Sequence, residues 1–342
     1  MTKQEIEEIY HLPLITLLHR ASEVHRKHHN PEELQISTLV SIKTGGCPED
    51  CAYCPQAARY HTKVNAADML TVEEVKQAAI QAKESGSSRV CMGAAWRNVR
   101  NNKDFDRVLE MVKTVNRMDM EVCCTLGMIT ENQAKRLAAA GLYAYNHNLD
   151  TSEEYYGEII STRGYEDRLK TIDNARNAGI TICSGGIIGM GETAEDRIGM
   201  LYTLSLLNPK PESVPINALV PVEGTPLAEQ KRVSSWEMIR MIATTRIVLP
   251  KTQVRLSAGR TEMSDEAQAL CFLAGANSIF SGDKLLTTPN PERSADQALM
   301  DILGLKPKKP FASAPQPVEV DLDPKDLPEE KQIKWSRPNL VR

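Results

Sequence analysis

Three cysteines lie close together near the start of the chain, in the segment 47–54 (CPEDCAYC). Their C-x3-C-x2-C spacing can place three thiolates on three irons of one [4Fe-4S] cubane and leave the fourth iron without a protein ligand. A structural zinc site would need a fourth ligand, and the nearest histidine is His61. Redox thiols would account for Cys51 and Cys54 but leave Cys47 unexplained. The spacing therefore favours a cluster with one open iron, to which a substrate or cofactor can bind.

A second motif, G-x-I-x-G-x-x-E, is formed by Gly185, Ile187, Gly189 and Glu192, between a predicted strand and a predicted helix. The segment 189–194 also fits a dinucleotide-binding G-x-G-x-x-A pattern, which is weak evidence alone. With the cysteine triplet, whose last Cys follows Tyr53, the motif resembles the radical S-adenosylmethionine (SAM) superfamily. The resemblance implies that the open iron binds the amino and carboxylate groups of SAM. It also implies that Gly189 and Glu192 contact SAM rather than NAD.

Three further cysteines, Cys91, Cys123 and Cys183, each lie in a different predicted strand. Inward-facing side chains of separate barrel strands meet in the lumen, so these three thiols can converge. The alternative is that each packs as a small buried hydrophobe, a common role of free cysteine. Neighbouring strand residues face opposite sides, so Cys124 is expected in the core when Cys123 faces the lumen. Cys271, in a helical stretch, is also expected in the core.

Several segments resemble the biotin synthase family within this superfamily, over about residues 10 to 305. They are 93–97, 145–151, 213–217, 254–260 and 274–280. In that family the barrel holds a [2Fe-2S] cluster bound by three cysteines and an arginine. Carried over by matching motif, the resemblance implies the ligands Cys91, Cys123, Cys183 and Arg255. From its chemistry alone, Arg255 would be assigned to a salt bridge in the lumen, because guanidinium groups prefer carboxylates.

Polar residues in these segments would be costly to bury unpaired, which predicts at least a hydrogen-bonded network. The resemblance implies binding roles instead. Asn148 and Asp150 would bind the ribose of SAM, Arg168 its carboxylate and Tyr53 its adenine, while Asn146 and Asn217 would help place the second substrate.

The activity implied by the resemblance is insertion of sulfur between two unactivated carbons of dethiobiotin, which forms biotin. The reduced [4Fe-4S] cluster, held by Cys47, Cys51 and Cys54, would cleave SAM to a deoxyadenosyl radical that abstracts hydrogen. The [2Fe-2S] cluster, with Arg255 among its ligands, would supply the sulfur, and two SAM molecules would be used per biotin. Implied partners are a low-potential reductant such as flavodoxin or ferredoxin and the iron–sulfur assembly machinery. A homodimer is also expected.

Two other functions remain open from the residues. Another radical SAM barrel enzyme, of the hydrogenase-maturation or methylornithine-synthase type, would share the triplet but has no need of Cys91, Cys123, Cys183 and Arg255 together. A non-enzymatic iron–sulfur carrier needs no SAM motif and normally ligates its cubane with four cysteines.

The elements that position these residues alternate along the chain. Short β-type segments are expected at 34–43, 88–93, 121–126, 142–148, 180–185, 213–220, 253–258 and 277–280. Helical composition is found between most of them, for instance at 71–85, 102–117, 130–140, 161–178 and 194–207. Eight such units predict a TIM-type (β/α)8 barrel. An open doubly wound sheet gives the same alternation and remains the alternative.

Three regions are expected: an N-terminal helical extension at 1–33, interrupted near Pro13, the barrel at 34–305 and a tail at 306–342. Seven of the chain's 19 prolines lie in 307–342, so this segment cannot continue regular α/β units.

Composition narrows the partners and the compartment. The 41 basic and 45 acidic residues leave a charge of −4, and aromatic residues make up only 5%. These values give no electrostatic reason to expect nucleic acid or an anionic membrane, so small-molecule ligands are expected. The acidic N-terminus, interrupted by Pro13, does not fit an export signal, and no apolar run is long enough to span a bilayer. The sequence therefore predicts a cytoplasmic protein whose eight cysteines are not disulfides.

Overall fold

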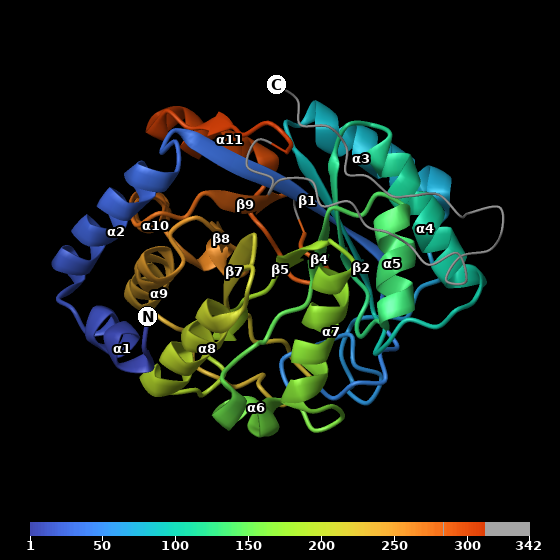
Figure 1. The fold of residues 1–342 in the computed structure, drawn as a ribbon, viewed down its shortest axis with the longest axis horizontal. Helices are drawn as coiled ribbons and strands as arrows, with labels where there is room; N and C mark the ends of the chain where they lie inside the picture. Colours follow the sequence, from blue (N-terminus) through green and yellow to red (C-terminus); the bar gives the residue numbers. More distant parts are fainter. Residues whose placement is uncertain (283, 312–342) are drawn as a thin grey trace.

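A closed barrel of parallel strands forms the centre of the molecule (Figure 1). The computed structural model describes residues 1–282 and 284–311. The strands are β1 (Glu33–Lys43), β2 (Arg89–Ala94), β3 (Glu121–Thr125), β4 (Ala144–Asn146), β5 (Thr181–Cys183), β6 (Gly186–Ile188), β7 (Ser213–Ala218), β8 (Gln253–Leu256) and β9 (Ser278–Ser281). Residues 35–38 of β1 pair in parallel with residues 278–281 of β9, which closes the barrel. The predicted (β/α)8 barrel is thus confirmed, and the open sheet is excluded.

One barrel strand is interrupted between β5 and β6. The first part pairs with β4 and meets β7 at Cys183, whereas the second part pairs with residues 216–218 of β7. A side chain at Gly185 would overlap the carbonyl oxygen of Pro215, so only glycine allows the two strands to approach here. β5 and β6 together form one of the eight strands of the barrel.

Helices surround the barrel (Figure 1). They are α1 (Lys3–Tyr10), α2 (Leu14–His28), α3 (Val72–Glu84), α4 (Lys103–Asn116), α5 (Glu131–Ala139), α6 (Glu153–Ile159), α7 (Tyr165–Asn177), α8 (Ala194–Leu206), α9 (Ser235–Val248), α10 (Asp265–Leu273) and α11 (Arg293–Leu303). The predicted interruption near Pro13 separates α1 from α2. Thr71, Thr130, Thr193 and Ser234 start their helices with capping boxes that satisfy free backbone N–H groups. The short helix α6 was not predicted.

Two sets of buried residues follow from strand alternation. The larger set includes Val90, Val122 and Cys124 together with apolar side chains of the helices, and Cys271 of α10 belongs to it. The smaller set lies inside the barrel and includes Cys91 and Cys123. Cys123 and Cys124 therefore face opposite sides of β3, as alternation predicts.

The two ends of the described chain pack on the barrel. Helices α1 and α2 lie against α9, and α1 also contacts α8. After α11, the two-residue strand β10 (Lys306–Pro307) pairs with Glu33 and Leu34 at the start of β1. Residues 312–342, most of the predicted tail, lie outside the described residues. In the described part of the chain, no helix combines the length and apolar composition needed to cross a membrane.

Candidate active site

A cavity of about 330 Å³ lies at the carboxyl ends of the barrel strands. Its wall includes twelve of the predicted site residues: Cys47, Cys51, Tyr53, Cys54, Cys91, Cys123, Asn146, Asn148, Asp150, Arg168, Asn217 and Arg255. The predicted residues outside this wall are Cys183, Gly189 and Glu192. The cavity therefore brings together segments that are far apart in the sequence, as the carboxyl end of a parallel barrel does.

The loop that follows β1 carries the first three thiols, here called the loop triad (Cys47, Cys51 and Cys54). The Cys47 N–H donates to the carbonyl of Gln56 (2.9 Å), and the Cys54 N–H donates to the carbonyl of Cys51 (2.9 Å). Gly45 adopts φ +70°, and a side chain there would lie 2.9 Å from the backbone of a neighbouring segment. These contacts fold the loop so that all three thiols reach the cavity wall.

The loop triad suits a cubane better than a single metal ion. Burial raises the pKa of Cys51 to about 11 and that of Cys54 to about 12, and it also raises the pKa of Cys47. The thiols are therefore protonated until a metal displaces the protons. A mononuclear zinc site would need a fourth ligand beside these three cysteines. A cubane requires only one thiolate per iron.

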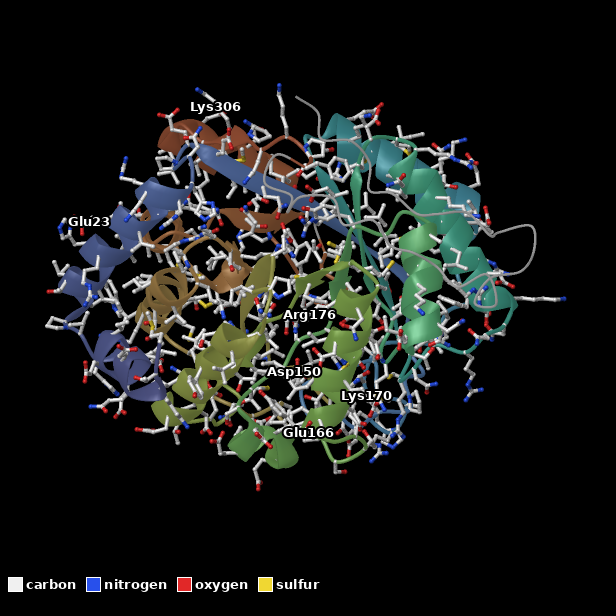
Figure 2. All side chains as sticks on the ribbon, in the orientation of Figure 1. Glu23, Asp150, Glu166, Lys170, Arg176 and Lys306 are labelled. Carbon is white, nitrogen blue, oxygen red and sulfur yellow. The ribbon has the colours of Figure 1, made fainter. Side chains whose placement is uncertain are left out.

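A connected polar network lies beside the loop triad. The Tyr53 hydroxyl donates to Asp150 Oδ2 (2.8 Å), and Arg168 forms a buried ion pair with the same oxygen. Arg168 also donates to the carbonyl of Asn148 (2.5 Å) and to the Tyr156 hydroxyl (2.8 Å). Asp150 lies in the interior, away from the peripheral Lys306 (Figure 2). Four of the residues predicted to bind SAM, Tyr53, Asn148, Asp150 and Arg168, thus form one wall of the cavity.

Two asparagines extend this wall deeper into the barrel. Asn146 Nδ2 lies 3.2 Å from Cys183 Sγ and 3.4 Å from Asn148 Oδ1. The Asn217 amide bonds to the backbone on both sides, donating to the carbonyl of Gly186 (3.0 Å) and accepting an N–H of the segment after β8 (3.2 Å). Asn146 therefore contacts a thiol directly, whereas Asn217 ties the backbone of β6 to the segment that follows β8.

A second group of thiols, the strand triad (Cys91, Cys123 and Cys183), lies inside the barrel. Cys91 and Cys123 are partners in the register of β2 and β3, and Cys183 is the partner of Asn146 in the register of β4 and β5. Cys123 forms hydrogen bonds with both other thiols. The hydrogen bond from Cys123 and then the charge of Arg255 lower the pKa of Cys183 to about 6. The three cysteines that could have been scattered in the core converge instead.

Arg255 reaches the strand triad from β8. Its guanidinium donates to Ser278 Oγ (2.9 Å) and Gln35 Oε1 (3.3 Å), and one of its nitrogens lies 3.8 Å from Cys183 Sγ. Its centre is 4.5 Å from the centre of the Phe280 ring. None of these partners is a carboxylate, and in the described part of the chain no salt bridge of Arg255 is found. Arg255 therefore lies beside the strand triad.

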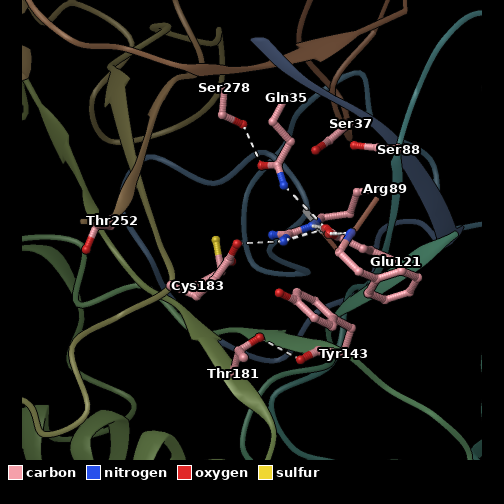
Figure 3. Close-up of polar contacts among 12 residues, drawn as sticks. Gln35, Ser37, Ser88, Arg89, Glu121, Tyr143, Thr181, Cys183, Thr252 and Ser278 are labelled. Atoms are coloured by element: carbon pink, nitrogen blue, oxygen red, sulfur yellow. Dashed lines mark hydrogen bonds and ion pairs between the residues drawn. The ribbon is translucent and has the colours of Figure 1, made fainter. Parts of the chain in front are cut away.

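The lumen salt bridge is made by a different arginine, Arg89. It pairs with Glu121 (2.7 Å) and Glu212 (2.9 Å) in a buried layer near the strand triad (Figure 3). Its charge, with that of Arg255, favours the thiolate form of Cys91. Three converging thiols bordered by the guanidinium of Arg255, which has no carboxylate partner among the described residues, are a donor set that fits a negatively charged, sulfur-ligated cluster.

The G-x-I-x-G-x-x-E motif lies behind the wall of the cavity. The Glu192 carboxylate accepts the N–H groups of Gly189 and Met190 (2.7 Å each) and pairs with Arg197 (2.7 Å). Its oxygens are therefore used to hold the turn, and neither Glu192 nor Gly189 reaches the cavity wall. The motif residue on that wall is Ile187.

Two further features of the wall were not predicted. His147 is fully buried, and burial lowers its pKa, so the imidazole is neutral; its Nε2 has no hydrogen-bond partner in the part of the chain that is described. The loop after β9 contributes residues 285–288 to the wall. Leu286 packs against Gly93, where a side chain would lie 2.7 Å from it. Two signals in the sequence could have indicated these features. His147 lies between two asparagines, and residues 285–288 follow the last barrel strand.

Two family models match the chain. Residues 41–203 match the radical SAM superfamily, and residues 215–306 match the biotin and thiamin synthesis associated domain. Among solved structures, the chain is similar to methylornithine synthase (TM-score 0.76, 20% identity, 90% of this chain and 94% of that chain). It is also similar to HydG, a maturase of the [FeFe]-hydrogenase (TM-score 0.77, 18% identity, 91% and 73%). At these identities the likeness shows the barrel fold alone.

Curated relatives are much closer in sequence. Biotin synthase of Christiangramia forsetii is 65% identical over 98% of this chain and 93% of its own length. Biotin synthase of Flavobacterium johnsoniae is 66% identical with the same coverage. The mitochondrial biotin synthase of Arabidopsis thaliana is 59% identical over 91% of this chain and 83% of its own length. On the strength of this identity along nearly its whole length, the chain belongs to the biotin synthase family of the radical SAM superfamily.

Proposed function

We propose that the chain forms biotin by inserting sulfur into dethiobiotin, with SAM as the source of the radical and a second cluster as the source of the sulfur. The observation that carries this proposal is that one cavity is bordered by all three cysteines of the loop triad and by Cys91 and Cys123 of the strand triad, with Cys183 buried beside these two. The loop triad lies at the carboxyl end of the barrel, and the strand triad lies inside it. Cleavage of SAM alone requires only the loop triad.

Cys47, Cys51 and Cys54 would hold a [4Fe-4S] cluster, which when bound supplies the electron that cleaves SAM and so produces a radical able to take hydrogen from an unactivated carbon. Arg168 provides a buried cation for the SAM carboxylate. Asp150 provides acceptors for ribose hydroxyls, together with Asn148, and Tyr53 provides a ring surface for adenine. Glu192 and Gly189 would contribute by holding the turn behind the site.

The second group would be a [2Fe-2S] cluster held by Cys91, Cys123, Cys183 and Arg255. When bound, it supplies the sulfur. Asn146 lies at hydrogen-bond distance from both Cys183 and Asn148, where an amide can position a polar ring such as the ureido group of dethiobiotin. Asn217 supports the same wall through its backbone contacts.

The partners and compartment follow from this function. Reduction of the first cluster requires a low-potential donor such as flavodoxin or ferredoxin. Rebuilding the second requires the iron–sulfur assembly machinery. We further propose that the protein is a cytoplasmic homodimer.

The decisive experiment counts clusters and follows sulfur. Iron and sulfide per chain, with Mössbauer typing, are expected to give one [4Fe-4S] and one [2Fe-2S] cluster. After reconstitution with isotopically labelled sulfide, label is expected in biotin while the [2Fe-2S] absorbance is lost. A cysteine persulfide reloaded by a desulfurase is the competing sulfur source. Unlabelled biotin formed while that absorbance stays constant would favour the persulfide and reject the consumed cluster.

A further inference from the structure

The end of the barrel opposite the cavity is covered by a short segment that follows α11. In Figure 1, α11 and the start of β1 lie together at one end of the barrel. The Lys306 N–H donates to the carbonyl of Glu32 (2.7 Å), and the Lys308 N–H donates to the carbonyl of Leu34 (2.9 Å). The segment then crosses the amino ends of the strands to Phe311.

Phe311 enters the lumen from this end. Its side chain is only 2% exposed and packs edge-on against Tyr143, with ring centres 5.3 Å apart. Its N–H donates to Glu121 Oε1 (2.6 Å), at the first residue of β3. Phe311 belongs to the same buried cluster as Cys91, Cys123 and Cys183. It therefore forms the floor beneath the strand triad.

The backbone at Phe311 also shows that its surroundings hold it in place. Its φ is +58°, a left-handed conformation that a residue with a large side chain adopts only when its neighbours enforce it. The ring contact with Tyr143 and the bond to Glu121 are the contacts that can do so. Loss of the ring would therefore remove both a seal and the reason for this conformation.

We propose that residues 306–311 are a removable plug, with Phe311 as its seal, through which iron and sulfide reach the strand triad from the amino end of the barrel. This inference rests on the proposed function, because a consumed cluster must be rebuilt. Iron and sulfide that enter from the carboxyl end would pass the loop triad and the wall formed by the residues predicted to bind SAM. Entry between strands would require breaking the hydrogen bonds that join the strands around the whole barrel. The plug offers a route that avoids the loop triad and that wall and leads past the buried ion pairs of Arg89 with Glu121 and Glu212.

The attachments of the segment fit this role. Within the described residues, its strand β10 pairs with Glu33 and Leu34, and these two residues pair with neither β2 nor β9. Release of Phe311 would break no hydrogen bond between barrel strands. By contrast, opening the lumen sideways would separate two strands of a closed barrel.

The test uses the full chain without clusters and measures alkylation of individual cysteines by N-ethylmaleimide, followed by mass spectrometry. Cys183 is the reporter, because it is fully buried and does not line the upper cavity. Cys124 and Cys271 are internal references, because they are buried outside the lumen. Phe311→Ala is expected to speed labelling of Cys183 at least about tenfold while leaving the references unchanged.

Two variants complete the design. Phe311→Leu keeps most of the apolar volume and is expected to stay within about threefold of the parent rate. Met241→Ala removes a buried side chain of α9 in the outer layer and is expected to leave Cys183 labelling unchanged relative to the references. Equal rates for Cys183 in the parent chain and in Phe311→Ala would overturn the proposal. A parallel rise of Cys124 and Cys271 would also overturn it, because it would indicate general unfolding.

The loaded protein gives a second readout. With SAM and dethiobiotin bound, loss of the [2Fe-2S] absorbance to an iron chelator is expected to be faster in Phe311→Ala than in the parent and in Met241→Ala. Failure of the proposed function is separable: a parent chain that takes up only one cluster rejects that function, whereas the alkylation rates of the cluster-free chain still decide whether Phe311 seals the lumen.

Discussion

Two adjacent cysteines offer a test of the strand triad in which the same atoms are removed on opposite faces of one strand. Cys123→Ala removes a thiol that faces the lumen, and Cys124→Ala removes one that packs against the helices. Both side chains are buried, with exposures of 1% and 0%. Each variant should therefore lose about 1 kcal/mol of stability, the usual cost of deleting one buried heavy atom. Stability alone should not distinguish them.

Cluster binding should distinguish them completely. Cys123 is hydrogen-bonded to both other thiols of the strand triad, so its loss removes the central member of the donor set. We expect Cys123→Ala to lose the [2Fe-2S] signal in visible absorption and Mössbauer spectra after reconstitution, while Cys124→Ala keeps it. Both should retain the [4Fe-4S] signal, and urea unfolding of the cluster-free proteins should give similar midpoints. Retention of the [2Fe-2S] signal by Cys123→Ala, or its loss from Cys124→Ala, would refute the assignment.

Three further outcomes are expected. Cys51→Ala should abolish reductive cleavage of SAM, measured as deoxyadenosine, because two thiolates hold a cubane poorly; full production would contradict the loop assignment. Burial lowers the pKa of His25 and His29 to about 3, so the unfolded chain takes up protons first as pH falls below 6.5. The unfolding free energy should then fall by about 2 kcal/mol for His25 between pH 6.5 and 5, and His25→Gln should flatten that urea-unfolding profile. Glu192→Gln weakens two backbone hydrogen bonds and the pair with Arg197 and should cost about 2 kcal/mol in the same assay, whereas an unchanged midpoint would argue against its support of the turn.

Much of the barrel could be predicted because its strands and helices carry local signals. The expected segment 34–43 differs from β1 by one residue at its start, and Thr71, Thr130 and Thr193 mark helix starts through their own caps. Closure between β1 and β9 could not be read, because pairing of distant strands leaves no local pattern. The break at Gly185 was also hidden, since it depends on the carbonyl of Pro215 in another strand.

The site was predictable to a different degree for each group. The loop triad is visible in the sequence because its spacing is local, whereas convergence of Cys91, Cys123 and Cys183 required the barrel and the family resemblance. The roles of individual polar residues remain predictions. The position of Glu192 behind the wall could not be foreseen, because a motif does not reveal that Arg197 and two backbone N–H groups use its oxygens.

The contrast between the two triads has a consequence for how the protein matures. The loop triad lies within eight positions of the chain, so its donors can be assembled by one short loop. The strand triad and Arg255 come from β2, β3, β5 and β8, and they meet only after the entropy of several long chain closures has been overcome. A nascent or partly folded chain can therefore offer the first donor set before the second exists. Occupation of the second site would report that the barrel has closed.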